Sequence, residues 1–126
     1  MLIQTNQLTK IYGSGERALS ALDSVTLSIE RGEFVAVVGS SGSGKSTLLH
    51  LLGGIDRPTE GTVAIDGTDL YSLAPDSLTV FRRRYIGFVF QSYNLIPGLN
   101  VWENIILPLG LDKLKADREE IEQLLS

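Results

Sequence analysis

A glycine-rich run near the end of the first third of the chain constrains its fold more than any other feature. The run fits the pattern G-x-x-x-x-G-K-[ST] and consists of Gly39, Ser40, Ser41, Gly42, Ser43, Gly44, Lys45, Ser46 and Thr47. Such a run connects a buried strand to a helix and surrounds phosphate groups. The apolar, β-branched residues 34–38 predict a buried parallel strand before it, and the leucine-rich residues 48–52 predict a helix after it.

The residue types of this loop suit a bound triphosphate. Backbone N–H groups that turn inward around phosphate oxygens require glycine where φ is positive or where a Cβ atom would collide, and Gly42 and Gly44 meet this requirement. The helix that begins near Lys45 adds unpaired N–H groups and the positive end of its dipole. We expect Lys45 to reach the β- and γ-phosphates and the Ser46 hydroxyl to be a Mg²⁺ ligand. The competing interpretation is a glycine-rich turn without a ligand.

Size and charge limit the partners of the chain. Its 126 residues correspond to one small domain or to part of one. A formal net charge of −4 offers no electrostatic argument for nucleic acid as a partner. No stretch approaches the ~18 apolar residues of a membrane span, so direct membrane insertion is not expected. The absence of cysteine from the sequence fits a reducing compartment, with the cytosol as the default.

Segments on both sides of the loop have the patterns of strands and helices. Residues 2–9 and 25–29 predict two strands, which we expect to pair ahead of the phosphate loop. Residues 62–67 predict a further strand and a turn, and residues 75–84 predict a helix with Pro75 in its first turn. The combination indicates an α/β protein.

The second half of the chain contributes one further candidate site residue. The short apolar run 86–90 predicts a strand that ends at Gln91, and open α/β sheets bind ligands at the carboxyl ends of their strands. Residues 92–100 predict a loop, and residues 101–107 predict a helix that ends before a proline. Apolar residues on one face of 112–126 predict an amphipathic helix.

Four features together resemble the nucleotide-binding subunit of an ABC transporter. They are Tyr12, the loop 39–47, the segment 54–61 and the run 85–91. Residues 88–97 are especially similar to the MacB/LolD group, whose members serve macrolide or peptide efflux, lipoprotein release and related envelope tasks. The resemblance implies an α/β fold of the P-loop NTPase class, ABC ATPase type.

On this resemblance the chain is a partial domain. Residues 1–91 correspond to the amino-terminal part of the ATPase core, with an antiparallel β subdomain and the P-loop strand–helix unit, and residues 92–126 to the Q-loop and the truncated beginning of the helical subdomain. After Gln91 the sequence has no serine-glycine-glycine signature, no apolar strand ending in Asp-Glu and no later histidine. We therefore expect the chain alone to be incompetent for hydrolysis and to leave apolar edges uncovered.

The resemblance also assigns roles to residues outside the loop. It implies that Tyr12 stacks on adenine and that Gln91 contacts Mg²⁺ and the attacking water and senses a transmembrane subunit. It implies that a coupling helix of that subunit docks on a region formed by Tyr93, Leu95, Ile96, Leu99 and Trp102. The alternatives are a turn tyrosine that packs locally and a small satellite core.

The function implied by the resemblance is that of an ATP-binding subunit at the cytoplasmic face of the membrane. With ATP, Mg²⁺ and a second nucleotide-binding subunit, it would couple ATP hydrolysis to export or extraction of a peptide, macrolide or lipoprotein-like substrate through a transmembrane permease subunit. One alternative is a truncated nucleotide-binding or interaction module without turnover. Another is a different P-loop enzyme, such as a small-molecule kinase, for which Tyr12 and Gln91 would have no explanation.

Overall fold

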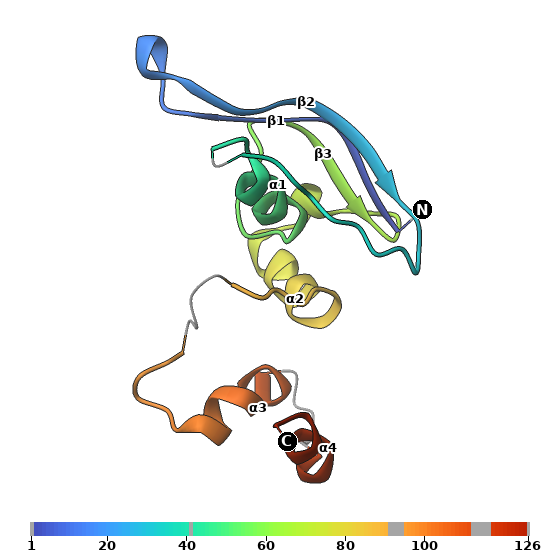
Figure 1. Cartoon of the computed structure of the whole chain (residues 1–126), viewed down its shortest axis with the longest axis vertical. Helices are drawn as coiled ribbons and strands as arrows, with labels where there is room; N and C mark the ends of the chain where they lie inside the picture. The colour runs from blue at the N-terminus through green and yellow to red at the C-terminus, as the bar shows by residue number, and fades with distance from the viewer. Residues whose placement is uncertain (1, 41, 91–94, 112–116, 126) are drawn as a thin grey trace. The chain divides into compact units, whose positions relative to one another are not determined.

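The computed structural model describes residues 2–40, 42–90, 95–111 and 117–125 (Figure 1). The chain divides into two compact units, Met1–Gly87 and Phe88–Ser126. The first unit contains β1 (Ile3–Tyr12), β2 (Leu19–Ile29), α1 (Lys45–Leu52), β3 (Glu60–Ile65), β4 (Thr68–Asp69) and α2 (Pro75–Tyr85). Short 3-10 turns at Gly15–Arg17 and Leu70–Ser72 complete it. The second unit contains α3 (Val101–Leu111) and α4 (Arg118–Leu125).

The first unit is built on an antiparallel sheet with the strand order β2-β1-β3-β4. Ile3 of β1 lies opposite Ile29 of β2 on one side and Ile65 of β3 on the other. This confirms the predicted pairing of two strands ahead of the loop, although both strands are longer than predicted. Gly61 has φ +86°, and a Cβ there would collide with the carbonyl oxygens of Asn6 and Gln7, so the close approach of β3 to β1 requires glycine.

A leucine-rich core joins α1 to the sheet. Figure 1 shows α1 between the sheet and α2. Leu48 and Leu51 of α1 are buried together with residues of the sheet, of the turn after β4 and of α2, namely Leu8, Leu22, Val63, Ile65, Leu70 and Leu78. The apolar face of α1 is therefore held against the sheet, and the loop at its amino terminus is held with it.

Two predicted strands are absent from the structure. Residues 34–38 and 86–90 have no strand structure, and the side chains of Phe34 and Val38 are 99% and 85% exposed. A parallel strand forms only where neighbouring strands supply hydrogen bonds on its edges, and none of the described segments lies beside 34–38 in this way. The strand predictions were therefore wrong for this chain, whereas the expectation of uncovered apolar surface is confirmed.

The helices of the second unit differ from their predictions at their ends. Asn100 and Glu103 form a reciprocal cap at the start of α3: the Glu103 N–H donates to Asn100 Oδ1 over 2.8 Å, and the Asn100 N–H donates to Glu103 Oε1 over 3.1 Å. The helix continues to Leu111, so the prediction that it ends before Pro108 was wrong, and the proline lies inside the helix, where it has no N–H to donate. The Asp117 side chain caps α4, which forms part of the amphipathic helix predicted for 112–126.

Candidate functional site

The glycine-rich loop leads directly into α1. Lys45 is the first residue of the helix, as predicted, and Gly44 precedes it with φ +93°. Gly42 also has a positive φ of 80°, so both positions have the backbone conformation that the pattern predicts. A Cβ on Gly44 would collide with the carbonyl oxygen of Ala21 in β2, so this glycine also allows the loop to lie against the sheet. Ser41 lies outside the described residues.

Lys45 lies over the start of the loop. Its half-buried side chain donates from Nζ to the carbonyl oxygen of Gly39 and, over 3.2 Å, to that of Ser40. The Ser43 N–H donates to the Ser40 carbonyl over 3.1 Å and closes a turn. The ammonium group is thus held beside the backbone that the sequence predicts to surround phosphates.

Ser46 is the residue of α1 that would hold Mg²⁺ together with phosphate oxygens and water. The Ser46 side chain is exposed one residue after Lys45. Among the described residues, no three His, Asp or Glu side chains gather as a metal cage. Mg²⁺ suits such a site, because it keeps several waters and binds substrate phosphates with few protein ligands.

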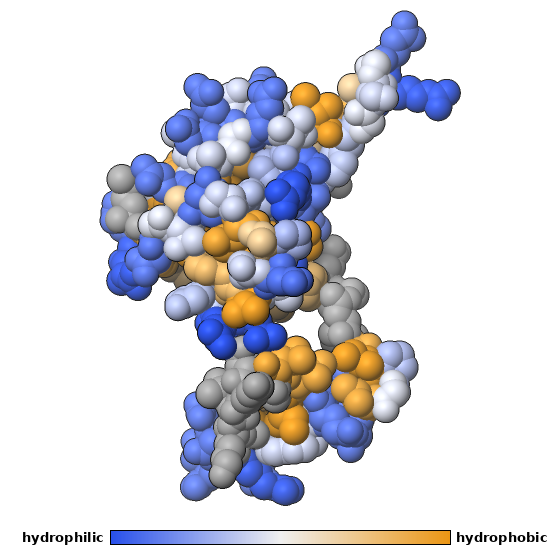
Figure 2. Space-filling model, turned by 180° about the vertical axis from the view of Figure 1, so that it is seen from behind, coloured by the Kyte–Doolittle hydropathy of each residue, from blue (hydrophilic) through white to orange (hydrophobic). Residues whose placement is uncertain are grey.

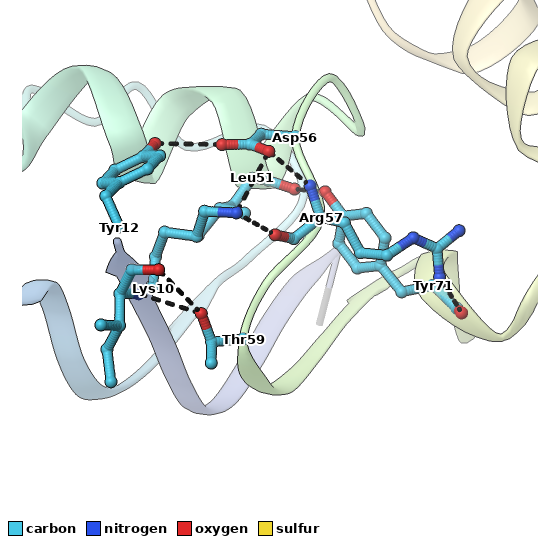
Figure 3. A network of polar contacts seen from close by, with 8 residues as sticks. Lys10, Tyr12, Leu51, Asp56, Arg57, Thr59 and Tyr71 are labelled. Atoms are coloured by element: carbon cyan, nitrogen blue, oxygen red, sulfur yellow. Dashed lines mark hydrogen bonds and ion pairs between the residues drawn. The ribbon is translucent and has the colours of Figure 1, made fainter. Parts of the chain in front are cut away.

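Tyr12 lies at the carboxyl end of β1 with its side chain 41% exposed. Its hydroxyl donates to Asp56 Oδ2 over 3.0 Å (Figure 3). Lys10, two residues earlier in the same strand, donates to Asp56 Oδ1 over 3.3 Å and to the Arg57 carbonyl over 2.7 Å. Lys10 Nζ also lies 5.1 Å from the centre of the Tyr12 ring. The predicted adenine-stacking residue is therefore anchored at its tip.

Asp56 accepts from three donors. Besides Tyr12 and Lys10, the Arg57 N–H donates to its Oδ1 over 2.9 Å. Partial burial raises the pKa of Asp56, but the hydrogen bonds from Tyr12, Lys10 and Arg57 outweigh it and hold this pKa below its usual value. The carboxylate therefore remains ionised and oriented at neutral pH.

The carboxyl end of α1 sets the position of Asp56. The Ile55 and Asp56 N–H groups donate to the His50 carbonyl over 2.9 and 3.3 Å, so the chain turns sharply after the helix. Tyr71 donates its hydroxyl proton to the Leu51 carbonyl over 2.5 Å and holds the same helix end from the other side (Figure 3). One short helix thus connects the glycine-rich loop to the anchor of Tyr12.

The other predicted site residues lie in the second unit or outside the described residues. Gln91 and Tyr93 are outside the described residues. Leu95 and Ile96 are exposed, whereas Leu99 and Trp102 are half-buried, and the Arg118 guanidinium lies 5.3 Å from the Trp102 ring. Both a docking surface and a small local core remain predictions for this region. Sequence reasoning missed Lys10 and Asp56, although the segment 54–61 was among the features of the resemblance.

Comparison with protein families decides the class to which the chain belongs. Residues 22–126 match the family described as ABC transporter. This match includes the loop, α1 and Asp56, and it spans most of the chain. The chain belongs to the ABC transporter family.

Curated relatives give its place within that family. The chain is 52% identical over 107 residues to the macrolide export ATP-binding/permease protein MacB of Hyphomonas neptunium. The aligned region covers 85% of the chain and 17% of MacB. It is 46% identical over 114 residues to the lipoprotein-releasing system ATP-binding protein LolD of Geobacter metallireducens. That aligned region covers 90% of the chain and 51% of LolD. The chain is of the MacB/LolD type and spans part of the length of these ATP-binding components.

A solved structure confirms the predicted fold class. The ATP-binding cassette MJ0796 of Methanocaldococcus jannaschii, solved as a dimer in a post-hydrolysis state with ADP and Pi, matches with a TM-score of 0.85 and 47% identity. The match covers 94% of this chain and 52% of that one. The chain therefore spans about half the length of LolD and of this cassette, and has part of a P-loop NTPase domain. In the part of the chain that the structure describes, no helix has the length and apolar character of a membrane span.

Proposed function

We propose that the protein containing this chain binds ATP with Mg²⁺ at residues 39–47 and hydrolyses it to drive export or extraction of a substrate through a membrane permease. The observation that carries the proposal is the junction of loop and helix. This junction combines three features at one place: a backbone that turns inward, an ammonium group and a helix amino terminus. The backbone has a positive φ at Gly42 and Gly44, and Lys45 is the first residue of α1.

Each site residue has a defined role in this proposal. Lys45 contacts the β- and γ-phosphates, where its positive charge offsets the charge that develops during phosphoryl transfer. The hydroxyl of Ser46 is a ligand of Mg²⁺, which neutralises the phosphates when bound. Tyr12 stacks on adenine, and Gln91 orients the attacking water and contacts the ion.

The relatives support the proposed partners and substrate class. MacB is named as an export ATP-binding/permease protein and LolD as part of a lipoprotein-releasing system, and the cassette MJ0796 was solved as a dimer. We accordingly assign a second nucleotide-binding subunit and a transmembrane permease subunit as partners, and we place the ATP-binding protein at the cytoplasmic face of the membrane. The permease contacts the region around Gln91, and the substrate is a peptide, a macrolide or a lipoprotein-like molecule.

The experiment that tests the proposal separates binding from turnover. The experiments use the natural-length protein, that is, the protein that contains this chain as the cell produces it. In this protein, Lys45→Ala should weaken binding of a fluorescent ATP analogue in the presence of Mg²⁺ by about tenfold or more, because one charge-assisted phosphate contact is lost. Phosphate release should fall with it. Arg31→Ala is the matched control, because Arg31 is an exposed cation that pairs with Asp66 over 2.8 Å. Equal binding by the wild type and Lys45→Ala would contradict the proposal.

The same measurements decide the alternative of a module without turnover. Lys45-dependent ATP binding without phosphate release, in the natural-length protein with its permease present, would favour that alternative. Transfer of the γ-phosphate to a small acceptor would instead indicate a kinase.

A further inference from the structure

We propose that Asp56 is a positioning residue for the nucleobase, because its carboxylate fixes the ring of Tyr12 in the orientation in which the ring meets a purine. This inference rests on the proposed function, since it assumes that Tyr12 stacks on the base of a nucleotide held by residues 39–47. It adds a residue that neither the loop pattern nor the resemblance assigns to the site.

The first step concerns the freedom of Tyr12. Its side chain is 41% exposed at the end of β1, so packing restrains only part of the ring. An exposed aromatic side chain samples several χ1 rotamers, and a stacking partner must select one of them at an entropic cost. The hydrogen bond of 3.0 Å from the Tyr12 hydroxyl to Asp56 Oδ2 selects a rotamer before any ligand arrives.

The second step concerns the rigidity of the anchor. Asp56 is useful as an anchor only if its own side chain is fixed, and its second oxygen Oδ1 accepts from Lys10 over 3.3 Å and from the Arg57 N–H over 2.9 Å. Hydrogen bonds to an ionised acceptor are stronger than neutral ones. Figure 3 shows Tyr12 and Lys10 pointing from the same strand toward this one carboxylate. One oxygen is thus committed to the framework and the other to Tyr12.

The third step concerns the distance between base and phosphates. The Asp56 N–H donates to the His50 carbonyl in the last turn of α1, and Lys45 begins that helix. The eight residues of α1 extend over about 12 Å. Because the helix is rigid, it sets the separation between the phosphate-binding loop and the anchor of Tyr12. The anchor of Tyr12 therefore keeps a fixed position relative to the loop that would hold the phosphates.

Other hydrogen bonds hold the segment around Asp56 in place. The positioning role of its carboxylate can therefore be tested separately from the stability of the fold. Thr59 donates its N–H to the Thr9 carbonyl over 2.9 Å, and its hydroxyl accepts from the Ile11 N–H over 2.9 Å. These bonds tie the segment after α1 to β1 without the carboxylate. Tyr12→Phe should therefore leave the thermal transition of the natural-length protein nearly unchanged. Asp56→Ala should lower the transition modestly, because Lys10 and the Arg57 N–H lose their acceptor.

The test compares two probes that share the phosphates and differ in the base. ATP and inorganic tripolyphosphate, each with Mg²⁺, are titrated into the natural-length protein by calorimetry. Tyr12→Phe keeps the ring and removes its anchor, and it should weaken ATP binding about three- to tenfold while leaving tripolyphosphate binding unchanged. Asp56→Ala removes the acceptor of the Tyr12 hydroxyl and should weaken ATP binding to a similar extent. The double variant should be no weaker than the weaker single variant, because both changes break the same contact.

Controls keep the inference separate from the proposed function. Asp66→Asn removes an exposed carboxylate that pairs with Arg31 instead of Tyr12, and it should change neither affinity. Three outcomes would overturn the positioning role. They are an unchanged ATP affinity in Tyr12→Phe, losses of ATP affinity that multiply in the double variant, or equal losses of affinity for ATP and for tripolyphosphate. Failure of Lys45→Ala to weaken either probe would instead contradict the proposed phosphate site itself.

Discussion

At the scale of single residues, Tyr71 shows how burial changes an ionisable group. Burial raises the pKa of its hydroxyl from 10.0 to about 12, with a smaller contribution from the charge of Asp56, and the proton is donated to the Leu51 carbonyl. The pKa of Tyr71 is higher in the folded state than in the unfolded state. The contribution of its protonated hydroxyl to the free energy of unfolding is therefore complete below about pH 10 and is lost as pH rises toward about 12.

The raised pKa of Tyr71 leads to a prediction for titration at alkaline pH. Tyr71 should ionise at a higher pH than a solvent-exposed tyrosine when the absorbance is followed at alkaline pH, and Tyr71→Phe should remove that late step. The Tm of the wild type should also fall more steeply above about pH 10 than that of Tyr71→Phe. Parallel Tm curves for the two proteins would show that the hydroxyl does not hold its proton more tightly in the folded state.

At the scale of elements, the junction between the loop and α1 depends on one glycine. Gly44→Ala places a side chain at φ +93° and against the Ala21 carbonyl, whereas Gly32→Ala has a similar φ of +85° with open space around it. Gly32→Ala should lower the free energy of unfolding by about 1–2 kcal/mol through the left-handed backbone alone. Gly44→Ala should lower it by about 2–4 kcal/mol and weaken ATP binding, because the loop must move away from β2. Urea unfolding with nucleotide titration measures both effects, and equal losses in the two variants would contradict the role of the collision.

At the scale of the whole molecule, many large apolar side chains among the described residues are exposed. Figure 2 shows hydrophobic residues, in orange, at the surface of both parts of the chain. Four exposed apolar residues belong to one short stretch of the sequence, namely Phe34, Val35, Val37 and Val38. Monomeric proteins rarely expose contiguous apolar patches of this kind, so the stretch is suited to burial against further structure.

This exposure predicts the behaviour of residues 1–126 produced by themselves. We expect them to bind a hydrophobic dye and to self-associate in sedimentation experiments, and Phe34→Ser with Val38→Ser should reduce both effects. Leu19→Ser is the control, because Leu19 is 66% exposed but lies outside this stretch. A monomer with a sharp, reversible thermal transition and no dye binding would contradict the prediction.

Local features of the site were predictable because they depend on neighbouring residues. The positive φ of Gly42 and Gly44, the start of α1 at Lys45 and the proline at the start of α2 follow from conformational preferences within a few residues. The alternation in 25–29 predicted a strand for a similar reason. The predictions failed at 34–38 and 86–90, where β-branched composition favours a strand but only neighbouring strands can form one.

The sequence by itself determined the glycine-rich loop, the helix that follows it and the resemblance to the ABC transporter family, because these reside in the order and spacing of adjacent residues. Only the tertiary structure decided that Tyr12 meets Asp56, which lies 44 positions away in the chain, and that Lys10 shares the same carboxylate. The physical reason is that backbone preferences act over a few residues, whereas a hydrogen bond between distant side chains forms only after β1 and α1 have packed against a common core.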